Sequence, residues 1–168
     1  LAPCSDWPQI IIVALHVYHM IGFKLSGEDL FHHLVFVPVI AGANFVMAWG
    51  LSSNVLAFFI SGLPGAIDYL LLAAVKAGSI SPMVEKRANC SINTWLRSPG
   101  IAGFCVLALV GWVNPPAGVS VPPWWLFVPG VGLAFFNGQY YAQRVVGNYY
   151  IRLTQDSGKK GITRVEMH

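Results

Sequence analysis

Residues 54–75 read NVLAFFISGLPGAIDYLLLAAV, and Asp68 is the only charged side chain in this run. A helix that crosses the hydrocarbon core of a bilayer needs about 20 apolar residues, because each residue adds about 1.5 Å along the axis. The run meets that requirement in length and in composition. Pro64 lies close to Gly62 and Gly65, so we expect a kink in the middle of this helix.

Four further apolar segments flank this run, and each is expected to form a helix. The whole pattern predicts an all-α integral membrane bundle of about five transmembrane helices within residues 1–151, with spans at about 8–23, 30–49, 54–75, 100–113 and 124–143. The first and fourth spans are short, so we expect helix tilt or local thinning of the bilayer. Residues 152–168 are expected to form a polar, basic C-terminal tail.

The composition also indicates a membrane protein. Hydrophobic residues make up 55% of the chain and charged residues only 10%, whereas soluble domains carry about 25% charged residues. A chain this poor in charge cannot cover a water-exposed surface, so membrane lipid is an expected partner. No long Lys/Arg run is present, which argues against a nucleic-acid partner.

The basic residues gather in segments that would share one side of a five-span bundle. They precede the second span, separate the third from the fourth, or follow the fifth: Lys24, Lys76, Lys86, Arg87, Arg97, Arg144, Arg152, Lys159, Lys160 and Arg164. The opposite loops, 50–53 and 114–123, carry no charge. The positive-inside rule therefore assigns the basic side, with the C-terminus, to the cytoplasm or its organellar equivalent.

Ionisable and polar side chains inside the expected spans are the candidate functional residues, because such groups are costly in lipid. His16, His19, His32, His33 and Asp68 would all lie in the half of the membrane next to the basic side. Asp68 is also expected to be a buried polar residue that pairs with a histidine of the first helix. Asn44 is the second expected buried polar residue, near the opposite interface.

Three interpretations of the histidines remain open from their pattern. They could pack as hydrogen-bonded interfacial residues, or one of them could act as an acid–base catalyst that Asp29 orients from three or four positions earlier. They could also bind a metal, haem or pigment, with His16 and His19 as the candidate cofactor ligands. An HExxH motif is absent, so we assign no metal ligand, and the pattern names no cofactor.

The segment Asp29-Leu30-Phe31-His32-His33 resembles the TLC-domain family, which includes translocation-associated membrane proteins, ceramide synthases and lipid-regulating homologues. The resemblance implies a multi-pass membrane protein that acts on or senses lipid acyl chains, in a eukaryotic endomembrane or organellar membrane. It further implies acyl transfer with His32 and His33 as catalytic residues and Asp29 as a supporting acid. Since adjacent helical residues point about 100° apart, we expect only one of the two histidines to face the site fully.

A different class of protein also fits the pattern. The small soluble mass and the small-residue pairs Ser61/Gly65 and Gly138/Ala142 are typical of a non-catalytic subunit in a larger respiratory or photosynthetic membrane complex. Such a subunit would pack against partner membrane protein chains and bind lipid or pigment. The sequence alone leaves both classes open, and with them the question of whether the chain is an enzyme.

Overall fold

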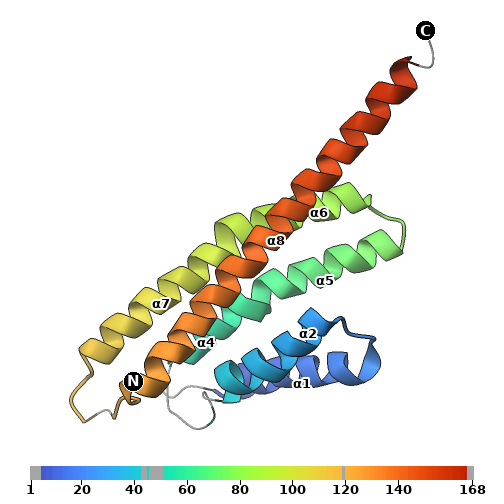
Figure 1. The fold of residues 1–168 in the computed structure, drawn as a ribbon. Helices are drawn as coiled ribbons and strands as arrows, with labels where there is room; N and C mark the ends of the chain where they lie inside the picture. The colour runs from blue at the N-terminus through green and yellow to red at the C-terminus, as the bar shows by residue number, and fades with distance from the viewer. Residues whose placement is uncertain (1–4, 43–44, 46–50, 119, 166–168) are drawn as a thin grey trace.

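The computed structural model describes residues 5–42, 45, 51–118 and 120–165, and these residues form helices and no strand. The prediction of an all-α chain is therefore confirmed for the described residues. Within these described residues, five continuous helical segments follow one another (Figure 1). They are α1 (Trp7–Gly22), α2 (Gly27–Phe31) with η1 (His32–Gly42), α4 (Leu51–Ala57) with η2 (Phe58–Gly62) and α5 (Leu63–Lys76), α6 (Pro82–Ile92) with η3 (Asn93–Arg97) and α7 (Ser98–Val113), and α8 (Trp124–Val165). The η segments are wider, π-helical stretches within these helices.

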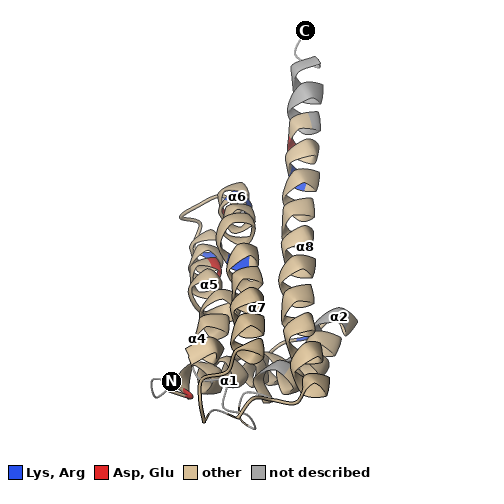
Figure 2. Cartoon of the chain, turned by 90° about the vertical axis from the view of Figure 1, so that its left-hand side faces the viewer, with Lys and Arg blue, Asp and Glu red and all other residues tan. Residues whose placement is uncertain are grey.

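Two of the helices, Leu51–Lys76 and Pro82–Val113, are long and apolar enough to cross a membrane by length and composition. Neither α4 nor α7 contains a charged residue, and Figure 2 shows how few charged residues the helices carry in all. Helix α1 is apolar but shorter.

The fourth helix begins at Pro82, well before residue 100, where the apolar pattern placed its start. Ser81 caps this helix by accepting a hydrogen bond from the backbone N–H of Val84 at 3.4 Å, and Pro82 follows in the first turn. This polar start of the helix packs against α5 and α8, and Glu85 and Asn93 are buried there. Arg87 and Arg97 therefore lie on the helix and not in a connecting loop.

Helix α8 continues through the expected fifth span and into the expected polar tail, ending at Val165. Figures 1 and 2 show its C-terminal part extending beyond the rest of the bundle. Hydroxyl side chains bond back to the helix here, since Thr154 and Ser157 each donate to a backbone carbonyl one turn earlier. The polar tail is therefore helical as far as Val165.

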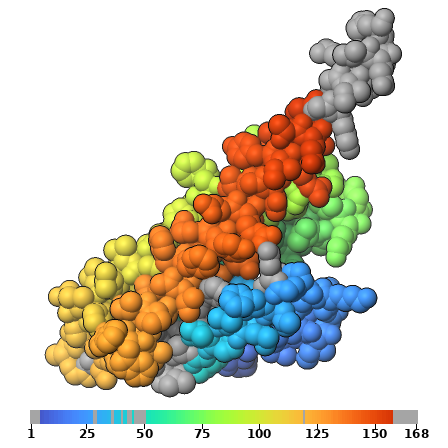
Figure 3. Space-filling model, viewed as in Figure 1, coloured from blue at the N-terminus to red at the C-terminus, as the bar shows by residue number. Residues whose placement is uncertain are grey.

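The packed core lies where α4, α7 and α8 meet. Ile101, Phe104, Phe127 and Ala134 are at most 4% exposed. Trp112 stacks on Phe127 with ring centroids 5.0 Å apart and donates its indole N–H to the carbonyl of Pro122 at 2.7 Å. In the space-filling view α8 lies across α6 and α7, while α1 and η1 pack below it (Figure 3).

Two glycines permit the close approach of neighbouring helices. A Cβ added to Gly100 would overlap the ring of Phe59, and one added to Gly138 would lie 3.0 Å from Ile101. Gly138 belongs to one of the small-residue pairs that suggested contact with a partner chain. In the structure it packs within the chain, where it permits α7 to approach α8.

Gly100→Ala is expected to lower the free energy of unfolding by about 1–3 kcal/mol, because the added methyl group forces Phe59 and its helix away from α7. Gly103→Ala is the matched control, since a Cβ at Gly103 meets nothing within 4 Å. The measurement is the unfolding transition of both variants in detergent. Equal transitions for the two variants would contradict the packing of Gly100 against Phe59. Adding Phe59→Leu to Gly100→Ala should recover part of the loss.

Candidate functional site

Four histidines converge between the first two helical segments. The ring centroid of His16 lies 5.1 Å from that of His33 and 6.0 Å from that of His32. His32 and His33 are 5.4 Å apart, and His19 lies 6.2 Å from His33. We call these four side chains the histidine cluster.

The local fold explains this convergence. His16 and His19 are three residues apart and so share a face of α1. Residues 23–26 then reverse the chain, so that η1 runs back along α1. His32 and His33 open the π-helical stretch η1, and His33 is only 8% exposed. Such wider turns are often found at functional sites.

Both adjacent histidines lie in the histidine cluster, although we expect only one of them to face the site fully. The centroid distances from His16 to His32 and to His33 differ by less than 1 Å. His16 lies on the opposing helix α1, so its ring can contact two neighbouring positions of η1.

Two tyrosines lie beside the histidine cluster. Sequence reasoning did not single them out as site residues. The hydroxyl of Tyr69, on α5, lies 2.8 Å from Nε2 of His19. The ring of Tyr141, on α8, lies 5.2 Å from that of His32. Four of the five helical segments therefore contribute to one site. The spacing within the sequence carries no signal for either tyrosine, because both contacts span distant parts of the chain.

His16 has a defined protonation pattern. Its Nδ1 lies 2.7 Å from the backbone carbonyl of Ile12, one turn earlier on α1. A carbonyl oxygen can only accept a hydrogen bond, so Nδ1 carries the hydrogen. In the neutral ring Nε2 is then the nitrogen with a free lone pair.

The remaining expected site residues lie apart from the histidine cluster or outside what the structure describes. Asp29 falls within α2, but its side chain is not among the described ones, and Asn44 is outside the described residues. Asp68 is half-buried on α5 and faces α6, where its Oδ1 accepts a hydrogen bond from Nδ2 of Asn89 at 2.7 Å. The expected pairing of Asp68 with a histidine is wrong. Its neighbour Tyr69 contacts the cluster instead, since consecutive helical positions point about 100° apart.

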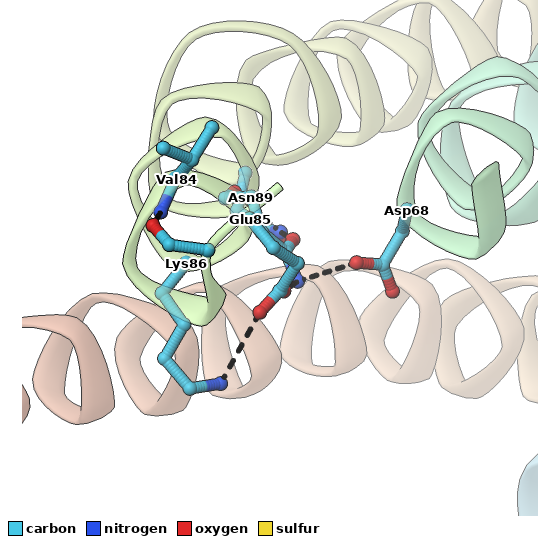
Figure 4. A network of polar contacts seen from close by, with 7 residues as sticks. Asp68, Val84, Glu85, Lys86 and Asn89 are labelled. Carbon is cyan, nitrogen blue, oxygen red and sulfur yellow. Dashed lines mark hydrogen bonds and ion pairs between the residues drawn. The ribbon is translucent and has the colours of Figure 1, made fainter. Parts of the chain in front are cut away.

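Asp68 belongs to a separate polar network between α5 and α6 (Figure 4). Asn89 also lies 3.4 Å from an oxygen of the buried Glu85, which pairs with Lys86 at 3.6 Å. Asn93 donates to Oδ1 of Asn89 at 2.6 Å. These contacts satisfy polar groups where the two helices pack, so the network has a clear structural role.

Arg97 links this network to the middle of the third helical segment. Its guanidinium donates to the backbone carbonyl of Ile60 at 2.5 Å. Ile60 belongs to the π-helical stretch η2 just before Pro64, where proline removes a backbone donor from the helix. Arg97 also attracts the carboxylate of Asp68 electrostatically.

Comparison with known proteins finds no matching family model, no matching curated protein and no matching solved structure.

Proposed function

We propose that the chain is a multi-pass integral membrane protein that acts on lipid acyl chains through the histidine cluster. The observation that carries the proposal is the convergence of His16, His19, His32 and His33 from two helices, joined by tyrosines from two others. Ionisable groups inside a membrane bundle are rarely kept without a function. The resemblance around Asp29 and the His32–His33 pair supports the same class of activity.

The surface of the helices supports a lipid environment. On α7, Val106, Leu107 and Val110 are all more than half exposed, as expected for side chains that face lipid and not water. The 32-residue helix Pro82–Val113 is about 48 Å long, which exceeds the roughly 30 Å hydrocarbon core. Its polar beginning would thus project beyond the core.

We place the basic end of this bundle on the cytoplasmic or organellar-equivalent side. The turns at 23–26 and 77–81 lie at the end toward which α8 extends, and the turn at 114–118 lies at the opposite end (Figure 1). Lys24 and Lys76 lie at or beside these turns and so mark the basic end. A eukaryotic endomembrane or organellar membrane is the proposed location.

The reaction that suits the cluster is acyl transfer from a thioester such as acyl-CoA to a lipid amine or hydroxyl. A neutral imidazole would accept the proton of the attacking amine or hydroxyl. The new amide or ester bond forms at the acyl carbon as the carbon–sulfur bond breaks, and the thiolate leaves and takes up a proton. His33 is the proposed base because it is buried and contacts His16, His19 and His32.

A second candidate is a non-catalytic subunit of a larger membrane complex. It is favoured by the C-terminal part of α8, which extends beyond the bundle and exposes Tyr150 and Ile151 by 59% and 57%. An exposed aromatic and aliphatic pair on a projecting helix suits contact with a partner membrane protein chain.

One experiment separates the two candidates. The chain is reconstituted in proteoliposomes with labelled acyl-CoA and a sphingoid base, and the intact particle is weighed after extraction in mild detergent from its native membrane. We expect a labelled N-acyl product and a particle no larger than a small homo-oligomer. No product in the wild type, together with a large particle that Tyr150→Arg releases, would exclude the enzyme and leave the subunit.

A further inference from the structure

We infer that His16, His32 and His33 form a binding site for a divalent first-row transition-metal ion of the zinc class. Each of these residues offers one ring nitrogen, and the three nitrogens lie within 4.8 Å of one another. Neutral imidazole is a preferred ligand for zinc and its neighbours in the first transition row. The inference concerns the cluster proposed as the acyl-transfer site, but it requires no turnover.

The three nitrogens are close to the spacing that such an ion needs. Three atoms at most 4.8 Å apart share a point that lies within about 2.8 Å of each of them, whereas a zinc–imidazole bond is about 2.0–2.1 Å long. Each ring would therefore move by less than about 1 Å. Small side-chain rotations can supply such a shift without moving the helices.

The hydrogen bond from Nδ1 of His16 to the carbonyl of Ile12 is the second observation in favour of a metal. Histidine ligands usually donate their other ring N–H to a carbonyl or carboxylate, which fixes the ring orientation and the tautomer. Here that bond leaves Nε2 of His16 as the nitrogen able to bind an ion. His16 and the carbonyl of Ile12 lie within one helix, so this ligand is pre-oriented.

Three protein ligands would leave a fourth position open on a tetrahedral ion, as in catalytic zinc sites. His19 lies beside this arrangement, 6.2 Å from His33, and its Nε2 meets the hydroxyl of Tyr69. While an ion is bound, the metal takes up the lone pair of His33, so the role of base assigned to His33 applies to the ion-free cluster.

The test uses tag-free, full-length protein that has been stripped with a chelator and titrated with Co²⁺, an optical substitute for zinc. We expect one Co²⁺ per chain, with the intense visible absorption of a four- or five-coordinate ion, and full displacement by Zn²⁺. His16→Gln should weaken binding at least about 100-fold, because it removes a direct ligand, and even outer partners of ligands contribute 10–100-fold. His19→Gln is the matched control, and it should change the affinity by less than about threefold.

Several results would overturn the inference, and none depends on acyl transfer. One is folded wild-type protein that binds no Co²⁺. Another is binding that persists unchanged in His16→Gln, and a third is binding lost equally in His19→Gln. Thermal unfolding of each metal-free variant checks that it is folded. If His16→Gln is unfolded, His32→Gln provides the same test. Protein that transfers acyl groups but binds no metal would reject this site alone, whereas protein that binds Co²⁺ but transfers nothing would reject the proposed function alone.

Discussion

His33→Ala is expected to lower the rate of acyl transfer by about 10²–10⁴-fold, the usual contribution of a general base. His33 is buried and touches the three other histidines of the cluster, so its imidazole is the group best placed to accept a proton there. The measurement is the initial rate of product formation from labelled acyl-CoA in proteoliposomes. Thermal unfolding of the same sample shows whether the bundle remains folded.

Two further variants make this result specific. His33→Gln retains a polar side chain of similar size and should also be inactive, which separates the loss of a base from the loss of packing. Val106→Ala, on the exposed face of α7 and outside the cluster, is the control and should retain full activity. Activity within threefold of the wild type in both His33 variants would remove His33 from the mechanism.

Arg97→Met is expected to cost about 1–3 kcal/mol of stability, the usual cost of leaving a buried polar group without its hydrogen-bond partner. The change removes the donor to the carbonyl of Ile60 and the positive charge near Asp68. The Asp68 carboxylate would then face the likewise negative, buried Glu85 with less compensation. The measurement is the shift of the unfolding transition in detergent.

Arg87→Met is the matched control, because Arg87 is exposed on the same helix; it should shift the transition by less than about 0.5 kcal/mol. Adding Asp68→Asn to Arg97→Met should recover part of the loss, since a neutral amide needs no countercharge. The loss of unfolding free energy in the double variant is compared with the sum of the losses in Arg97→Met and Asp68→Asn. If the two are equal, the attraction between Arg97 and Asp68 does not contribute to stability.

The expected third helix shows what apolar periodicity predicts well. Residues 54–75 were expected to be helical, and a continuous helix covers Leu51–Lys76. Apolar content and length are properties of one segment, so no knowledge of its neighbours is needed. The same reasoning failed at Pro82, because the first turns of that helix are polar and make their contacts with α5 and α8.

The site was predicted in part. His16, His19, His32 and His33 were selected from the sequence because ionisable groups are costly in lipid, and the structure brings all four together. The sequence does not predict the contacts of Tyr69 and Tyr141, and it predicts a histidine partner for Asp68 where the structure has Asn89. A helix in this bundle packs against several neighbours, and its rotation about its own axis decides which neighbour each side chain meets. Two consecutive residues point about 100° apart, so Asp68 and Tyr69 meet different helices.

The sequence by itself determined the helical class, the shortage of charge and the identity of the four histidines, because these follow from composition and from spacing along one helix. Only the tertiary structure decided that Tyr69 and Tyr141 meet those histidines and that Asp68 faces Asn89. It also decided that His16 lies against both His32 and His33. The physical reason is that contacts between distant segments depend on how helices pack and rotate against one another, which close packing at positions such as Gly100 and Gly138 sets.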